Sequence, residues 1–338
     1  MKLISTLDPL SLYDKNFYIG KSILITGASG VVGFNLAYNL LTLYGESISI
    51  DLIGRTSLTS CQSEFLAFSN ANYIKLDLSK SDSISKLSHN FYDIVFHSAT
   101  YAQPLKYQEE NLSTIILNTS ATHSLASLVK KGGSFCFLSS TDIYYGNNKL
   151  PYKETDIGSF DPWQPRGCYF ESKRMGETIC SVMAKLDINV KVIRLALGYG
   201  VGFKIDDKRV LYKFIRDAIT KQEINMMDDG RAPRTYIYIS DVVKMILNAV
   251  SSGKHNVYNV GSNERTTIRN IAELISKNLG TNLNIPDSTE LYLKDAPHDV
   301  WVDITRYKKE FNDPISVNLE DGISRCIDWT KYLLSNKT

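Results

Sequence analysis

The sequence predicts an α/β protein in which a doubly wound parallel sheet carries a smaller C-terminal α/β lobe. Short β-branched runs alternate with longer helical patterns over residues 1–200, a glycine-rich turn joins the first run to the first helical pattern, and the rhythm changes after residue 200. We expect residues 1–200, with 240–262 returning to them, to form the larger domain, and residues 201–338 to form the smaller lobe.

Each strand is expected where a short run rich in apolar residues lies between turn residues, as at 23–25, 94–96 and 135–138. The expected strands are 22–26, 48–53, 73–77, 93–98, 134–139 and 190–195. Helices are expected where apolar residues recur at helical spacing, over 31–43, 84–89, 111–130 and 169–185. Beyond residue 200 we expect a polar loop to 208, a helix at 210–219, a strand at 235–239, a helix from 241 and a strand at 257–260.

Composition excludes several classes of protein. The chain has 338 residues, of which 43% are hydrophobic and 22% charged, so it is a globular chain that can bury a sizeable core. Its net charge is +2 without a basic block, so we expect no nucleic-acid partner. Asp8 and Pro9 interrupt the apolar N-terminus, and no run approaches the length of a membrane span, so we expect neither a signal peptide nor a membrane segment.

The five cysteines are odd in number, widely scattered and without CxxC spacing. This pattern indicates neither a disulfide framework nor a zinc site, and we expect a cytoplasmic protein without a metal.

A glycine-rich turn is the first strong chemical signal. It directly follows the apolar run at 23–25 and directly precedes a helical pattern. Glycine at 27 and 30 allows a tight turn and the approach of a pyrophosphate, and glycine at 33 lets the helix pack close to the strand. The helix N-terminus supplies an anion site. The context predicts a Rossmann-type dinucleotide site that includes Gly27, Ser29, Gly30, Val31, Val32 and Gly33.

The end of the second strand bears on which dinucleotide is expected. A carboxylate there binds the adenosine 2′-hydroxyl of NAD, whereas an arginine suits the 2′-phosphate of NADP. Asp51 stands 18 residues after Gly33, near the spacing of the motif. If the strand continues through Leu52 and Ile53, Arg55 occupies its end instead. We therefore expect NAD or NADP, with a lean towards NADP.

A tyrosine and a lysine four residues apart form the second signal. Tyr169 and Lys173 would share one helix face, where the ammonium favours the phenolate needed for proton exchange. Thr141 follows a buried run at the sheet edge where ligands bind, so it could hold a substrate oxygen beside Tyr169. The alternatives are a surface helix that carries the pair by chance and a turn threonine that bonds its own backbone.

With these three motifs in order, the chain resembles an extended short-chain dehydrogenase/reductase of the nucleotide-sugar epimerase/dehydratase group. Segments 161–174, 207–210 and 230–241 resemble the UDP-glucuronate decarboxylase and dTDP-glucose 4,6-dehydratase branch. The resemblance implies that Thr141, Tyr169 and Lys173 are catalytic, and that Lys173 also holds the cofactor ribose. It implies further cofactor contacts from Asp77, Leu78, Ser98, Ala99, Thr100 and Asn118. It implies that Arg234, with Arg209 as a second candidate, contacts the diphosphate of a nucleotide-activated sugar.

One loop departs from the resembled enzymes. Dehydratases carry Thr-Asp-Glu and decarboxylases Thr-Ser-Glu where this chain has Thr141, Asp142 and Ile143. Elimination needs an acid and a base, and Asp142 could be the acid, but Ile143 cannot accept a proton. We therefore expect hydride transfer at C4 of a nucleotide-hexose, as a 4-epimerase or a 4-ketoreductase. Dehydration or decarboxylation is the alternative, and a non-catalytic cofactor-sensing protein is a remote one.

The resemblance also implies a homodimer, because in the resembled group the helices expected at 111–130 and 169–185 pair with their symmetry mates as a four-helix bundle. The alternative is that their apolar positions face only their own sheet. The late diphosphate arginine of the group has no counterpart around 299–303.

Overall fold

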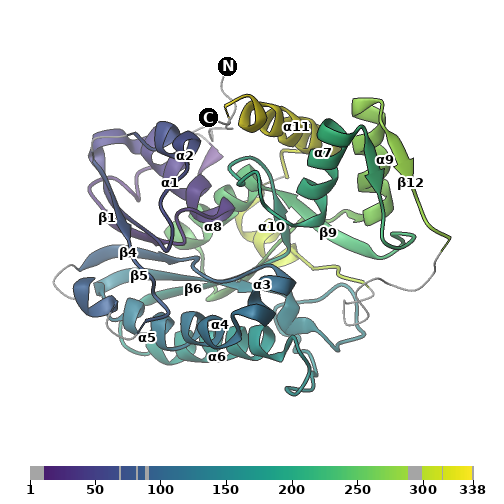
Figure 1. Cartoon of the computed structure of the whole chain (residues 1–338). Coiled ribbons are helices and arrows are strands. Elements are labelled where there is room, and N and C mark those ends of the chain that lie inside the picture. Colours follow the sequence, from purple (N-terminus) through teal and green to yellow (C-terminus); the bar gives the residue numbers. More distant parts are fainter. Residues whose placement is uncertain are drawn as a thin grey trace.

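The computed structural model describes residues 11–67, 70–80, 83–87, 91–287, 299–313 and 315–336. Seven parallel strands form the main sheet in the order β10-β6-β5-β4-β1-β2-β3 (Figure 1). They are β1 Ser22–Thr26, β2 Ser49–Gly54, β3 Ala71–Lys75, β4 Tyr92–His97, β5 Val129–Ser140, β6 Asn189–Leu195 and β10 Val257–Val260. The strand order reverses between β1 and β4, which is the switch point where a doubly wound sheet binds its ligands.

Helices cover both faces of the main sheet (Figure 1). Those over one face are α1 Val31–Tyr44 and α8 Ile239–Ser252, and those over the other are α4 Asn111–Asn118, α5 Ser120–Ala126 and α6 Gly167–Met183. The side chains of β1 pack alternately on the two faces of the main sheet, because successive side chains of a strand point to opposite faces. Ile23 and Ile25 pack with the residues of α1 and α8, whereas Leu24 packs with those of α5 and α6.

A second, three-stranded sheet has the order β11-β9-β7, and β12 pairs with β8 in a third. We call these two sheets with α7, α9 and α11 the C-terminal lobe. Its elements are β7 Leu197–Tyr199, α7 Val210–Lys221, β8 Glu223–Asn225, β9 Pro233–Tyr238, β11 Arg265–Thr267, α9 Ile268–Leu279, β12 Asn282–Asn284 and α11 Leu319–Ser335. Between β9 and β11 the chain returns to the main sheet, where β10 pairs with β6.

The remaining elements are short. They are α2 Ser60–Phe65, α3 Pro104–Glu109, α10 Thr305–Phe311 and the 3₁₀ turns η2 Gly45–Ser47, η3 Ile84–Leu87 and η4 Thr141–Tyr144. None of the helices in the described ranges combines the length and the apolar character that a membrane span requires.

The prediction of one continuous helix over 111–130 was wrong. The structure divides it into α4 and α5 at Thr119 and begins β5 at Val129. The Leu117 carbonyl accepts hydrogen bonds from His97 Nε2 at 2.9 Å and from Thr122 Oγ1 at 3.4 Å, so side chains replace a regular helical bond there. The helix predicted over 84–89 is only the turn η3, and residues 88–90 lie outside the described residues. The strand predicted over 73–77 is observed two residues earlier, as β3.

Candidate functional site

The glycine-rich turn between β1 and α1 leaves almost no room for side chains. Gly27 has a φ of +70°, and a Cβ there would lie 2.9 Å from the Ala99 amide nitrogen. A Cβ on Gly33 would overlap the Gly27 carbonyl oxygen. Gly30 caps α1, so the amides of the first helical turn, from Val31 on, have no partner within the helix. This close-packed backbone has the shape and the donors that a pyrophosphate requires.

Two buried polar atoms in the segments that follow β4 lack a hydrogen-bond partner among the described residues: Thr100 Oγ1 and Asn118 Oδ1. Asn118 Nδ2 donates to Ser172 Oγ at 2.9 Å, which holds the amide in place. Ser98 Oγ donates to the Thr26 carbonyl at 2.5 Å and ties the end of β4 to β1. A buried polar atom without a partner costs about 1–3 kcal/mol, so both atoms indicate a ligand. Together with the glycine turn, they fit a bound dinucleotide.

The structure separates the two candidates for contacting the adenosine ribose. Asp51 lies inside β2, where its carboxylate accepts hydrogen bonds from the Tyr92 hydroxyl at 2.6 Å and the Asn72 amide at 3.2 Å. At about 3.3 Å per residue, Asp51 is roughly 10 Å short of the strand's end. Arg55 directly follows β2, and its guanidinium carbon lies 4.8 Å from the centre of the Tyr101 ring. Arg55 thus stands at the strand end and Asp51 within the strand, and which of them contacts the adenosine ribose stays a prediction.

Asp77 and Leu78 form a turn after β3. The Asp77 carboxylate accepts hydrogen bonds from the Ser79 amide at 3.0 Å and the Ser79 hydroxyl at 2.7 Å, so it caps its own turn. Leu78 is buried in the apolar core, and the neighbouring Leu76 amide donates to the Gly54 carbonyl at 2.9 Å. This turn is therefore fixed to the end of β2, and the contact to adenine stays a prediction.

Tyr169 and Lys173 lie one turn apart on α6, and both are buried. Lys173 Nζ donates to the Leu138 carbonyl at 2.6 Å and lies 5.8 Å from the centre of the Tyr169 ring. Burial lowers the pKa of Lys173 to about 7, although Glu177 raises it. Burial, followed by Asp142, raises the pKa of Tyr169 well above its usual value. The proton exchange expected of Tyr169 stays a prediction, because it depends on the oxidised nicotinamide ring as well as on Lys173.

The loop after β5 brings the Ser140 hydroxyl to Tyr169, and a substrate contact from Thr141 stays a prediction. The Ser140 side chain hydrogen-bonds the Tyr169 phenol, and its Oγ accepts from the Asp142 amide at 3.1 Å. Thr141 is the first residue of η4 and is buried. Sequence reasoning missed Ser140, although it stands beside Thr141 in the same hydroxyl-rich stretch. The register at the end of β5 decides which hydroxyl meets α6.

A cluster of charged groups, in which Arg166 is buried and Asp142 and Arg234 are half-buried, faces Tyr169 where the main sheet meets the C-terminal lobe. Tyr107 stacks on Tyr169 with ring centroids 4.7 Å apart, and its hydroxyl accepts from Arg166 Nε at 2.7 Å. Burial raises the pKa of Asp142, while Arg166 and then Arg234 lower it in part. Arg234 lies in β9, so the cluster joins both parts of the protein.

Sequence reasoning missed two members of this cluster. Arg166 stands three residues before Tyr169 within the stretch that carries the family resemblance, and that position was the available signal. No motif marks Tyr107, which reaches the site through the placement of α3 beside α6.

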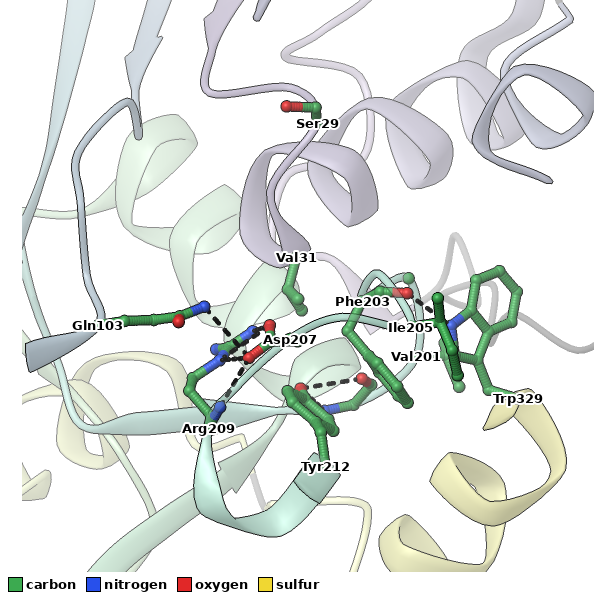
Figure 2. A network of polar contacts seen from close by, with 12 residues as sticks. Ser29, Val31, Gln103, Val201, Phe203, Ile205, Asp207, Arg209, Tyr212 and Trp329 are labelled. Carbon is green, nitrogen blue, oxygen red and sulfur yellow. Dashed lines mark hydrogen bonds and ion pairs between the residues drawn. The ribbon is translucent and has the colours of Figure 1, made fainter. Parts of the chain in front are cut away.

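Arg209 lies just before α7, near the start of α1 (Figure 2). Its Nε and Nη2 donate to the Asp207 carboxylate at 2.6–3.2 Å, and its guanidinium carbon lies 4.8 Å from the centre of the Tyr212 ring. Gln103 Nε2 donates to the same carboxylate at 3.2 Å and links the segment after β4 to the C-terminal lobe. A diphosphate contact from Arg209 would have to compete with this ion pair.

Comparison with known proteins gives one family. The model described as the NAD dependent epimerase/dehydratase family matches residues 23–261. UDP-glucuronic acid decarboxylase 1 of Arabidopsis thaliana is 28% identical over 309 residues, covering 90% of this chain and 68% of that protein. UDP-glucuronic acid decarboxylase 1 of Danio rerio is 28% identical over 311 residues, covering 91% of this chain and 72% of that protein.

Solved structures give one fold. The epimerase Mth375 of Methanothermobacter thermautotrophicus has a TM-score of 0.82 at 19% identity, covering 94% of each chain. The UDP-glucuronic acid 4-epimerase of Bacillus cereus, in complex with UDP-glucuronic acid and NAD, has a TM-score of 0.76 at 22% identity, covering 92% of this chain and 99% of its own. These comparisons confirm the predicted Rossmann-type fold and the predicted family resemblance.

Proposed function

Because the chain belongs to the NAD dependent epimerase/dehydratase family and is thus a nicotinamide-dinucleotide-dependent enzyme, we propose that it transfers hydride at C4 of a nucleotide-hexose, as a 4-epimerase or a 4-ketoreductase. The observation that carries this proposal is the buried Tyr169 phenol, which contacts Ser140 at the end of β5 and lies one turn from Lys173. Relatives named for UDP-glucuronic acid support a nucleotide sugar as the substrate class. When bound, the nicotinamide ring gives or takes the hydride.

Each residue of the set has a role in this proposal. Tyr169 exchanges a proton with the C4 oxygen, Ser140 and Thr141 orient that oxygen, and Lys173 holds the cofactor ribose. Burial raises the pKa of Tyr169, so the phenol carries its proton until a cofactor and a substrate change its surroundings.

Two side chains argue against elimination. Ile143, where the resembled enzymes carry glutamate, is 4% exposed and packs in the apolar core, so no base stands there. Glu171, a neighbouring carboxylate, accepts from Arg174 Nη1 at 3.0 Å. Asp142 supplies one carboxyl near Tyr169, whereas elimination divides its work between an acid and a base.

Decarboxylation of a nucleotide uronate is the second candidate, because the curated relatives reported above are UDP-glucuronic acid decarboxylases. Arg166 and Arg234 near Asp142 could receive the carboxylate of a uronate. The loss of the glutamate at position 143 counts against this candidate.

Product masses distinguish these reactions. We would incubate the protein with NAD or NADPH and a panel of UDP-, dTDP-, GDP- and CDP-hexoses, uronates and 4-keto sugars. An unchanged mass with inverted C4, or a gain of two hydrogens by a 4-keto sugar, would support the proposal. Loss of water or of carbon dioxide would overturn it.

We also propose a homodimer. Apolar side chains on the outer faces of α4 and α6 are 37–71% exposed: Leu112, Ile115, Ile116, Met175 and Val182. The two helices lie together over one face of the main sheet (Figure 1), and a second copy of the chain would bury these side chains. Sedimentation should give twice the chain mass of 38.1 kDa, and a monomer at micromolar concentration would reject the dimer.

A cytoplasmic location is also part of this proposal. The five cysteines are free thiols, as is usual for proteins of a reducing compartment.

A further inference from the structure

Lys173 and Glu177 reach from one face of α6 to neighbouring residues of β5. They stand four residues apart on the helix, the spacing at which two side chains share a face. Lys173 Nζ donates to the Leu138 carbonyl at 2.6 Å, and Glu177 Oε1 accepts from the Ser139 hydroxyl at 2.5 Å. Because Leu138 and Ser139 are consecutive, the ammonium and the carboxylate are anchored next to each other at the end of β5.

The surroundings of the Lys173 side chain are apolar and aromatic. Lys173 is 2% exposed, and its Nζ lies 4.7 Å from the centre of the Phe137 ring. From β4, His97 faces it as a neutral imidazole, because burial lowers the pKa of His97 to about 3. On its own helix it faces Glu177 and the Cys180 thiol, whose pKa burial raises. Glu177 is therefore the counter-charge of the ammonium.

Arg194 binds the same carboxylate from β6. Its Nε donates to the two Glu177 oxygens at 3.1 and 3.2 Å, and its Nη2 donates to Oε2 at 2.7 Å. Its Nη1 donates to the Tyr144 hydroxyl at 2.9 Å and to the Glu154 carbonyl at 2.8 Å, so the guanidinium is held in place. The negative charge of Glu177 is thus shared between a fixed guanidinium and the buried ammonium of Lys173.

Two opposed effects act on the Lys173 proton. Burial favours the neutral amine, whereas the carboxylate one helical turn away favours the ammonium. Because these effects leave the pKa of Lys173 at about 7, a modest change in the nearby charge adds or removes its proton at neutral pH. The ammonium is the form that favours loss of the proton from the neighbouring Tyr169, whose ring centre lies 5.8 Å from Nζ.

We propose that Glu177 keeps Lys173 protonated at neutral pH, and that Arg194 limits this effect by binding the same carboxylate. Glu177 is thus a positioning residue that acts through Lys173. The inference rests on the role proposed for Lys173 in hydride transfer and deepens it, because it adds the two side chains that set the charge of the ammonium. It predicts opposite effects for the two members of one ion pair.

The titration of Lys173 in the full-length protein tests this inference. It can be followed by NMR after isotope labelling of the lysine ε-carbons, and the resonance that Lys173→Met removes belongs to Lys173. We expect a midpoint at about pH 7 in the wild-type protein. The midpoint should be at least about one pH unit lower in Glu177→Gln and at least about half a unit higher in Arg194→Gln.

Two control variants separate charge from packing. Glu171→Gln removes a 41% exposed carboxylate from the same helix and should leave the midpoint within about 0.3 unit of the wild-type value. Glu177→Asp keeps the charge and should titrate closer to the wild-type protein than Glu177→Gln does. An aspartate variant that titrates like the glutamine variant would overturn the inference.

A purely structural role of the ion pair would move the midpoints of Glu177→Gln and Arg194→Gln in the same direction or leave both unchanged, and either result would overturn the inference. Each variant also tests it alone, so Arg194→Gln decides the matter if Glu177→Gln does not fold. Because the titration is read without substrate, it is independent of the C4 reaction: opposite shifts in a protein without C4 chemistry would sustain this inference and reject the proposed function.

Discussion

Arg194 and Glu177 form a nearly buried ion pair one helical turn beyond Lys173, with Nη2 and Oε2 2.7 Å apart and side chains 9% and 14% exposed. Ser139 Oγ also donates to Glu177 Oε1 at 2.5 Å. The pair therefore joins α6 to the ends of β5 and β6 behind the site.

Removing the carboxylate of this pair should destabilise the fold. Glu177→Gln leaves the Arg194 guanidinium buried without its counter-charge, which costs about 3–5 kcal/mol of the free energy of unfolding. Glu171→Gln is the matched control on the same helix, because its pair with Arg174 is 41% exposed on the glutamate side, and it should cost less than about 1 kcal/mol. Urea denaturation measures both, and equal costs would contradict the role given to Glu177.

Tyr169→Phe keeps the ring that stacks on Tyr107 and removes only the phenol proton. We expect turnover to fall by about two to four orders of magnitude, as for the loss of a general acid–base group. Dinucleotide affinity, measured by fluorescence titration, should stay as in the wild-type protein. Unchanged turnover would reject Tyr169 as the proton-transfer residue.

The buried Lys173 should make stability depend on pH. In the folded protein it binds its proton only below about pH 7, whereas an unfolded lysine holds it up to about pH 10.4. Between these values the unfolded state binds more protons, so the contribution of Lys173 to the free energy of unfolding rises with pH.

Lys173→Met removes this dependence. The free energy of unfolding of the variant minus that of the wild-type protein should therefore be larger at about pH 7 than at about pH 9.5. Urea denaturation of both proteins at the two pH values gives the comparison. A difference that does not change with pH would mean that Lys173 titrates normally.

The two candidate diphosphate arginines should differ in their effect on nucleotide binding. Arg209 is held by three hydrogen bonds to the Asp207 carboxylate, whereas Arg234 lies in the charged cluster near Asp142. With UDP as the probe, we expect Arg234→Gln to weaken binding at least about tenfold and Arg209→Gln less than about threefold. Equal losses in calorimetry would show that Arg209 leaves Asp207 to bind the diphosphate.

The main sheet and its glycine turn were predictable because both follow from patterns of neighbouring residues in the sequence. The strands follow from apolar runs, and β1 and β10 were predicted at their observed bounds. The turn follows from three glycines between a strand and a helix, each needed where a Cβ would meet backbone. Local patterns could not predict the break at Thr119, because the Leu117 carbonyl beside it bonds His97, which lies on β4.

The site was predictable only in part, because some of its residues come from segments that lie far apart in the sequence. Tyr169 and Lys173 lie on one helix and could be paired by spacing. Tyr107 and Arg194 come from other segments, and only the folded chain brings them to Tyr169 and Glu177.

Transfer of deuterium from a C4-deuterated nucleotide sugar tests the central claim most directly. We would mix such hexoses and uronates with the protein and the oxidised dinucleotide, denature the mixture, and read the masses of dinucleotide and sugar nucleotide together. We expect the deuterium either on the recovered dinucleotide, where the ketone is released, or back at C4 of an inverted sugar, where the dinucleotide returns it, and a sugar product that has lost neither water nor carbon dioxide. A C4-inverted product whose deuterium has been replaced by solvent hydrogen, or a product lacking carbon dioxide or water, would contradict hydride transfer at C4 as the whole reaction.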